Sequence, residues 1–206
     1  MRVTVIDYKA GNLTSVLKAL RHLGAHVEVT DRDTSLIRNA ERLVLPGVGH
    51  FAATWRLDDT GMTSAIREAI GRGVPFLGIC VGMQWLYAGS SEAPEQKGLG
   101  HFPELCARFP ECGEKVPHVG WNSLDIIGPT RLFAGVSQGA HVYFTHSYRA
   151  PVSQVTSATT AYIEEFAAAV ERENVMGVQF HPEKSSAAGL RILRNFLEWT
   201  PEGMAC

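Results

Sequence analysis

The feature that most constrains the fold is an apolar segment, residues 74–79, that runs directly into the glycine-flanked Cys80. A strand without polar residues is buried on both faces, which is typical of a parallel sheet covered by helices. The N-terminal half repeats this pattern: strand-like runs at 2–7, 26–30 and 42–45 alternate with helical stripes at 13–23 and 62–70. We therefore predict an α/β fold with three layers, an open and mostly parallel sheet with helices on both faces.

The pattern changes between about residues 99 and 160. Turns and short strand-like pieces dominate there, with candidates at 124–127, 141–144 and 154–158. They predict a small antiparallel extension of the sheet. Residues 175–180 are expected to form a last core strand and 187–199 a closing helix, with Ser185 or Ser186 as its N-cap. Because no linker interrupts the pattern, we expect residues 1–206 to form one domain.

Composition narrows the range of partners. The 206 residues are 45% hydrophobic and 19% charged, with a formal net charge of −2 and no basic run. Nucleic acid and anionic membranes are therefore poor candidate partners. The chain has no run of about 18 apolar residues and its start is too quickly polar for a signal peptide, so a reducing cytoplasm is the expected compartment.

Cys80 is the candidate nucleophile. Gly78 and Gly82 flank it at −2 and +2, between the apolar strand and an expected helix at 81–87. A sharp strand-to-helix turn that exposes a nucleophile needs small residues at those positions. The alternative is a buried structural cysteine. The other cysteines, Cys106, Cys112 and Cys206, lack this context and are expected to be inert.

His181 and Glu183, on either side of Pro182, are the candidate base and its orienting carboxylate. His181 follows a predicted strand that would end at the same sheet edge as Cys80. A carboxylate on one imidazole nitrogen fixes the tautomer, so that the other nitrogen can take a thiol proton. The alternatives are a solvated surface loop or a metal ligand pair. Without a second histidine or a cysteine pair nearby we expect no metal, and we expect no cofactor.

A third segment, Pro-Gly-Val-Gly at residues 46–49, ends the third predicted strand. Its two glycines allow backbone amides to face a cleft, where they can stabilise an oxyanion. The alternative is an ordinary turn at the end of a strand.

The order and spacing of these three segments resemble the class I (triad) glutamine amidotransferases. Two further segments, 115–122 (Lys-Val-Pro-His-Val-Gly-Trp-Asn) and 143–148 (Tyr-Phe-Thr-His-Ser-Tyr), narrow the resemblance to the glutaminase subunits of imidazole glycerol phosphate synthases. The resemblance extends over residues 5–199. It departs at Lys9, where that family usually has a glycine.

The resemblance implies a glutaminase in which Cys80 attacks the carboxamide of L-glutamine, His181 shuttles protons and Glu183 orients His181. Ammonia leaves, and water then releases glutamate from the thioester. The resemblance also implies an oxyanion hole formed by the amides of Val48 and Val81, with a peptide flip near Val48. The positions that match glutamine-holding residues are Gly49, Gln84, Ser147 and Tyr148.

The chain shows no obvious acceptor site for ammonia, since it has neither a phosphate-binding nor a dinucleotide-binding glycine motif. The resemblance implies a heterodimer with a (β/α)₈-barrel cyclase, which receives the ammonia through a channel and makes imidazole glycerol phosphate and AICAR in histidine biosynthesis. Positions matching the interface are Asn12, Pro117, Trp121, Asn122, Tyr143 and Lys184. Trp121 and Tyr143 are equally plausible as core aromatics, whereas Lys184 could meet a carboxylate of the partner.

Other functions stay open on the sequence. The chain could serve a pyridoxal-phosphate or anthranilate system, although anthranilate-type subunits usually have proline where Val48 stands. It could be a non-catalytic docking module, which the intact Cys80, His181 and Glu183 argue against. It could also be an unrelated cysteine peptidase or esterase-like hydrolase, which Gln84 disfavours.

Overall fold

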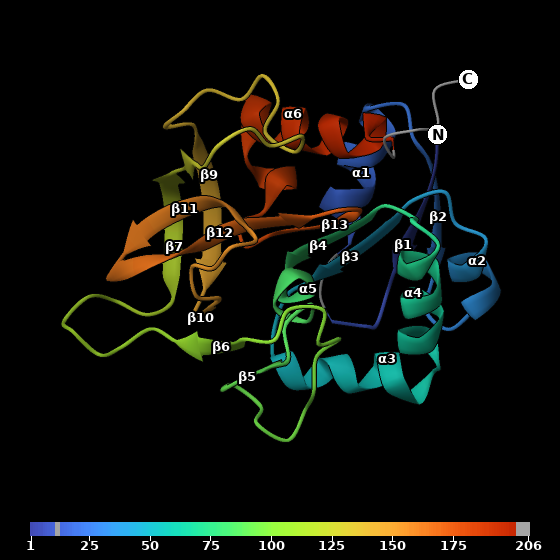
Figure 1. Ribbon diagram of the computed structural model, residues 1–206, viewed down its shortest axis with the longest axis horizontal. Coiled ribbons are helices and arrows are strands. Elements are labelled where there is room, and N and C mark those ends of the chain that lie inside the picture. The colour runs from blue at the N-terminus through green and yellow to red at the C-terminus, as the bar shows by residue number, and fades with distance from the viewer. Residues whose placement is uncertain (11–12, 201–206) are drawn as a thin grey trace.

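Five parallel strands form the centre of the computed structural model, which describes residues 1–10 and 13–200 (Figure 1). In spatial order they are β2 (His26–Thr30), β1 (Arg2–Ile6), β3 (Leu43–Gly47), β4 (Phe76–Cys80) and β13 (Val175–Val178). Three antiparallel strands continue the same sheet beyond β13: β12 (Glu164–Arg172), β11 (Thr156–Tyr162) and β8 (Asp125–Ile126). Of the three predicted pieces of the antiparallel extension, those at 124–127 and 154–158 thus overlap strands of the main sheet, whereas the one at 141–144 belongs to a separate two-stranded sheet.

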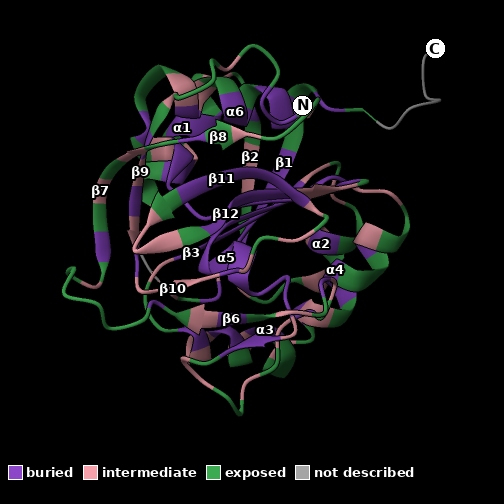
Figure 2. Ribbon diagram, turned by 60° about the vertical axis from the view of Figure 1, so that its left-hand side comes forward, coloured by how far each residue is buried: buried purple, intermediate pink, exposed green. Residues whose placement is uncertain are grey.

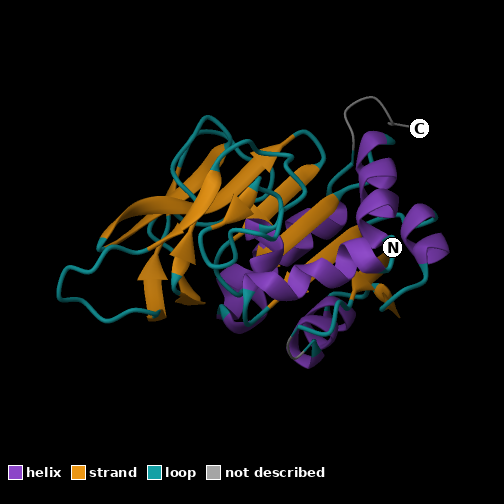
Figure 3. Cartoon of the chain, turned by 90° about the horizontal axis from the view of Figure 1, so that it is seen from below, coloured by secondary structure: helices purple, strands orange, loops and turns teal. Residues whose placement is uncertain are grey.

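Helices cover both faces of the parallel strands, as predicted. On one face lie α1 (Thr14–His22) and α6 (Ser186–Glu198), and on the other α2 (Thr34–Arg38), α3 (Trp55–Asp59) and α4 (Met62–Gly71) (Figure 1). A 3₁₀ turn, η1 (Phe51–Thr54), precedes α3, and the short α5 (Val81–Gln84) follows β4 directly. Seen from below, the helices surround the parallel strands and leave the antiparallel end to strands and loops (Figure 3).

Two small sheets complete the antiparallel end. The hairpin of β7 (His118–Ser123) and β9 (His141–His146) is one, and β10 (Tyr148–Arg149), β6 (Leu105–Arg108) and β5 (Gly89–Ser90) form the other. The last short element, η2 (Pro182–Lys184), joins β13 to α6.

Burial follows the apolar pattern of the sequence. Every residue of β3, β4 and β13 is buried, and α4 buries Met62, Ala65, Ile66 and Ala69. Spacings of three and four residues place those side chains on one face of a helix. Figure 2 shows α5 and the adjoining parts of the central strands inside the molecule, so that Cys80 emerges from the core of the fold.

Three local predictions were incomplete or wrong. No strand was predicted for residues 164–172, where three alanines and four charged residues resemble a helical composition; β12 is a strand because β11 and β13 pair with both of its edges. The helix expected at 81–87 ends at Gln84. Ser185 occupies the N-cap position of α6 without capping it, because its hydroxyl donates to the His181 carbonyl oxygen at 2.6 Å.

Candidate active site

The register of the sheet brings the three sequence segments to one edge. Gly47 at the end of β3 pairs with Cys80 at the end of β4, and Val178 at the end of β13 pairs with Ile79. The chain leaves all three strands at their carboxyl ends, which is where open α/β sheets place their ligand sites. Cys80, Val48 and the turn that carries His181 therefore meet although they are distant in sequence.

Cys80 sits on a strained turn. Its backbone has φ 55° and ψ −112°, a region that a residue with a side chain rarely occupies. The turn also explains the flanking glycines, since a Cβ on Gly78 would lie 2.4 Å from the carbonyl oxygen of Gly82, and one on Gly82 would lie 1.8 Å from that of Leu45. The strand, the turn and the helix start thus have the form predicted for a nucleophile elbow.

His181 and Glu183 form a buried pair. Nδ1 of His181 lies 2.9 Å from Oε1 of Glu183, and the two side chains are 2% and 5% exposed. Burial disfavours the charged imidazole, but the nearby Cys80 sulfur and the Glu183 carboxylate outweigh it and raise the pKa of His181 to about 10. The histidine is therefore poised to hold a proton beside the sulfur.

The neighbouring strand β9 fixes this turn from outside. The backbone N–H of His181 donates to the Tyr143 carbonyl oxygen at 2.9 Å, and the Ser185 hydroxyl accepts the backbone N–H of Tyr143 at 3.0 Å. Because Tyr143 is one of the predicted interface residues, the backbone that would meet a partner is bonded directly to the His181 turn.

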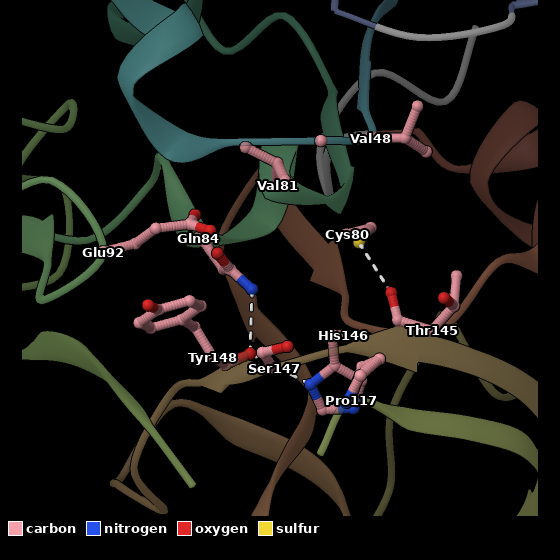
Figure 4. Close-up of a pocket in the computed structure, with 11 residues that line it drawn as sticks. Val48, Cys80, Val81, Gln84, Glu92, Pro117, Thr145, His146, Ser147 and Tyr148 are labelled. Carbon is pink, nitrogen blue, oxygen red and sulfur yellow. Dashed lines mark hydrogen bonds between the residues drawn. The ribbon is translucent and has the colours of Figure 1, made fainter.

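A cavity of about 200 Å³ opens at the Cys80 sulfur (Figure 4). It is lined by Val48, Gly49, Cys80, Val81, Gln84, Glu92, Pro117, Thr145, His146, Ser147 and Tyr148. The structure thus brings together all four predicted glutamine-binding positions, both predicted oxyanion residues and the predicted nucleophile. Its size suits a ligand smaller than a drug-sized molecule.

The amide of Gln84 has a defined orientation in this cavity. Its Nε2 atom donates to the carbonyl oxygen of Tyr148 at 2.9 Å and to Oε1 of Gln179 at 3.1 Å. Since a carbonyl oxygen only accepts, both N–H groups of Gln84 are engaged by the protein. The side-chain oxygen is then the group that Gln84 offers to a donor on a ligand.

One of the two predicted oxyanion donors is already engaged in this conformation. The backbone N–H of Val48 donates to the carbonyl oxygen of Ala10 at 3.2 Å, so its one hydrogen is already engaged. Gly49 follows with φ +96°, which only glycine adopts readily. The N–H of Val81 begins α5, where no intrahelical acceptor exists for it.

Four further residues of the site were not predicted: Glu92, Thr145 and His146, which line the cavity, and Gln179, which lies beside Cys80. Glu92 is the one carboxylate among the residues lining the cavity, and its Oε2 accepts the backbone N–H of Phe51 at 2.8 Å. Gln179 is fully buried, and its Nε2 lies 3.6 Å from the Cys80 sulfur. A sequence signal existed for Gln179, because it is a polar residue at the end of an apolar strand and two positions before His181.

The predicted interface residues lie on one side of the site. Trp121 is 52% exposed and meets Tyr143 edge-to-face at 6.1 Å between ring centroids, so the core alternative for Trp121 is wrong. Nζ of Lys184 lies 5.7 Å from the Tyr143 ring centroid. Asn122 donates to the Ala161 carbonyl oxygen at 3.0 Å, and Pro117 lines the cavity. Asn12, like Cys206, lies outside the described residues.

Two negative findings concern residues 1–10 and 13–200. They contain no group of three or more histidine, cysteine, aspartate or glutamate side chains placed to hold a metal ion. No helix there has the length and apolar character that crossing a bilayer requires.

A strained cysteine at the carboxyl edge of an open α/β sheet, beside a buried histidine–glutamate pair, defines a class of enzymes that use a thiol nucleophile. The model of the family "Glutamine amidotransferase class-I" matches residues 4–199. The chain therefore belongs to the class-I glutamine amidotransferases.

Relatives and solved structures agree with this assignment. The imidazole glycerol phosphate synthase subunit HisH of Moorella thermoacetica is 48% identical over 199 residues, covering 95% of this chain and 94% of that protein. Imidazole glycerol phosphate synthase hisHF, chloroplastic, of Arabidopsis thaliana is 44% identical over 201 residues, covering 95% of this chain and 34% of that protein. A crystal structure of a glutamine amidotransferase superposes with a TM-score of 0.74 at 21% identity, covering 95% and 97% of the two chains, which confirms the predicted fold.

Proposed function

We propose that this chain is the glutaminase subunit of an imidazole glycerol phosphate synthase and serves histidine biosynthesis. The observation that carries the proposal is Cys80, which adjoins the His181–Glu183 pair and lines a cavity together with Gln84. The relatives from Moorella and Arabidopsis favour this acceptor system over a pyridoxal-phosphate or anthranilate system. We also propose that residues 1–206 act as one amidotransferase domain.

The proposed chemistry starts from a His181 ring that carries a proton beside the Cys80 sulfur. The Cys80 sulfur attacks the carboxamide carbon of L-glutamine, forming a C–S bond and a tetrahedral oxyanion. His181 delivers its proton to the nitrogen, ammonia departs as the C–N bond breaks, and a glutamyl thioester remains. Water, deprotonated by His181, then attacks the thioester carbon; the C–S bond breaks, glutamate departs, and the sulfur and the protonated His181 return to their starting state. Glu183 holds the imidazole at Nδ1 throughout, leaving Nε2 for these transfers.

The cavity offers complementary groups for the amino-acid end of glutamine. Glu92 supplies a carboxylate for the substrate's ammonium group, and the free side-chain oxygen of Gln84 supplies a second acceptor. Gly49, Ser147 and Tyr148 line the rest of the cavity and would hold the remaining polar groups. This arrangement would favour a free amino acid over a peptide, whose nitrogen carries no charge.

The oxyanion hole requires a change of conformation. The Val81 amide starts α5 next to Cys80, but the Val48 amide is bonded to Ala10. We infer that the peptide between Gly47 and Val48 rotates, which the conformational freedom of Gly47 favours. Until then the site lacks one of its two predicted oxyanion donors.

Ammonia needs an acceptor, and we propose a (β/α)₈-barrel cyclase subunit that forms a heterodimer with this chain and receives the ammonia through a channel. The cyclase would make imidazole glycerol phosphate and AICAR. The exposed Trp121, the Tyr143 ring and Lys184 offer it an aromatic and cationic surface beside the His181 turn. The three described cysteines are free thiols, which agrees with a reducing cytoplasm.

The test compares wild type with Cys80→Ser in the reconstituted pair with the cyclase subunit. The variant should lose synthesis driven by glutamine and keep synthesis driven by added ammonia, because the second activity belongs to the partner. Cys112→Ser, which changes an exposed thiol, is the matched control and should keep both activities. Loss of both activities in Cys80→Ser would show that Cys80 is structural, and no synthesis with any subunit pair would exclude this acceptor system.

A further inference from the structure

Two histidines that take no part in this mechanism face each other inside the β7–β9 hairpin. His118 and His146 are register partners, both are buried, and Nδ1 of His118 lies 3.1 Å from Nε2 of His146. A ring of aromatic side chains surrounds them: Phe109, Phe144, Tyr162 and Phe166. His146 also lines the cavity that holds Cys80.

The hydrogen bonds at the two ends fix which nitrogen of each ring carries the hydrogen. Nδ1 of His146 lies 2.9 Å from the Tyr148 carbonyl oxygen, which only accepts, so Nδ1 must carry the hydrogen. Nε2 of a neutral His146 then accepts, so the hydrogen of the 3.1 Å contact sits on Nδ1 of His118. Nε2 of His118 is left to accept from Nδ2 of Asn122, at 3.5 Å.

The surroundings keep both rings neutral. Burial lowers the pKa of His118 to about 4. Burial, opposed by the bond to Tyr148 and assisted by the neighbouring His118 and His181, lowers the pKa of His146 to about 3. Beyond Phe109, which packs on His146, Arg149 lies over the Phe109 ring and pairs with Glu164.

Hydrogen bonds connect the Tyr148 carbonyl oxygen to Cys80. The Tyr148 carbonyl oxygen also accepts from Gln84, whose second N–H donates to Gln179, and Gln179 donates to the Cys80 sulfur. Protonating His146 would set its Nε2–H against the Nδ1–H of His118, and protonating His118 would set its Nε2–H against the amide N–H of Asn122. The neutral pair therefore supports the orientation of Gln84 and, through it, of Gln179.

We propose that His118 and His146 are positioning residues of this active site. As neutral Nδ1–H tautomers they fix the Tyr148 carbonyl and thereby turn the Gln84 side-chain oxygen toward the substrate. They do not touch the reacting atoms. The kinetic part of this inference rests on the proposed glutaminase function, whereas the tautomers are a property of the free chain.

The first test is ¹⁵N NMR of the imidazole nitrogens in the full chain. We expect Nδ1–H signals for both rings and no titration of either between about pH 5 and 8, where an ordinary histidine changes charge. An Nε2–H tautomer of His146, or protonation of either ring in this range, would overturn the proposal. This measurement needs no variant and no partner.

The second test compares two substitutions at one position in the complex with the cyclase subunit. His146→Asn places an amide N–H near the position of Nδ1 and should keep the KM for glutamine within about threefold of wild type. His146→Leu leaves the Tyr148 carbonyl without this donor, and should raise KM about tenfold with a smaller change in kcat. His141→Leu, on the same strand but exposed, is the control and should change neither constant.

Equal KM values for His146→Asn and His146→Leu would overturn the positioning role. Failure of the proposed glutaminase function gives another result: wild type itself would show no turnover of glutamine. The NMR result would be unaffected in that case. If both variants fail to fold, the NMR measurement on the unchanged chain still identifies the tautomers of His118 and His146. An Nε2–H tautomer of His146 would then overturn the proposal on its own.

Discussion

The backbone N–H of Val48 and the carbonyl oxygen of Ala10 are hydrogen-bonded at 3.2 Å. This bond joins the loop after β3 to the segment after β1, on the same sheet edge as Cys80. It engages the hydrogen that the proposed oxyanion hole would use, whereas the proposed base and its carboxylate, His181 and Glu183, are already hydrogen-bonded to each other. The proposed oxyanion hole therefore lacks one of its two donors in this conformation.

The first prediction follows from that bond. The purified chain alone should hydrolyse glutamine slowly, and the cyclase subunit with its own substrate bound should raise kcat by roughly 100- to 1,000-fold, the effect of one oxyanion donor. A glutamate-release assay with and without the partner measures this. The Cys80→Ser variant should show no activity in either condition. Full turnover by the isolated chain would contradict gating by the Val48 peptide.

The second prediction concerns Lys9, which stands where the family usually has glycine and has φ 63°. Lys9→Gly should be more stable than Lys9→Ala by roughly 0.5–1 kcal/mol, because the left-handed conformation costs more in a residue with a Cβ than glycine loses in unfolded-state entropy. Urea unfolding of both variants measures the difference. Neither variant keeps the ion pairs of Lys9 with Asp7 and Asp31, so their loss cancels in the comparison. Equal stabilities would show that the backbone relaxes at this position.

The sequence predicted the sheet edge well because local patterns determine it. Apolar strands, a glycine-flanked Cys80 and the His181 turn each have a recognisable sequence pattern, and parallel register places their ends together. Gly78 and Gly82 were predictable for the same reason, because a sharp turn at Cys80 needs small residues on both sides. In the structure both glycines lie against backbone atoms that leave no room for a Cβ.

Other features depend on tertiary contacts that no short pattern specifies. The strand β12 has the composition of a helix and is a strand only because it pairs on both edges. Glu92 lies in a loop, and its place in the cavity depends on a bond to the distant Phe51 amide. The state of the Val48 amide depends on Ala10, a contact across two segments that sequence spacing does not reveal.

The third prediction concerns the proposed interface. Trp121→Ala should weaken binding to the cyclase subunit by at least about tenfold, because an exposed aromatic ring packed on Tyr143 has the character of an interface hot spot. Calorimetry of the two subunits measures the affinity. Trp55→Ala removes a ring of similar exposure, 48% against 52%, from helix α3, and should bind like wild type. Equal weakening by both substitutions would argue against this interface.

The fourth prediction assigns substrate binding to Glu92. Glu92→Gln keeps an oxygen for the Phe51 amide but loses the charge, so the KM for glutamine should rise about tenfold with little change in kcat. Steady-state kinetics of the complex measure both constants. Glu95→Gln, a nearby substitution that does not alter a residue lining the cavity, is the control. A fall in kcat at constant KM would place Glu92 in the chemical step instead.

The fifth prediction concerns the proton on His181. Its folded-state pKa of about 10 lies above the ordinary value of about 6.5, so the charged imidazole contributes stability that is complete below about pH 6.5 and is lost as the pH rises through 10. Cys80→Ser removes the sulfur and leaves Glu183 alone to oppose the effect of burial. The pKa of His181 should therefore fall. NMR titration of the His181 ring in wild type and Cys80→Ser measures the shift, with Cys112→Ser as the control that should titrate like wild type. An unchanged His181 titration in Cys80→Ser would show that the sulfur does not hold the proton on the imidazole.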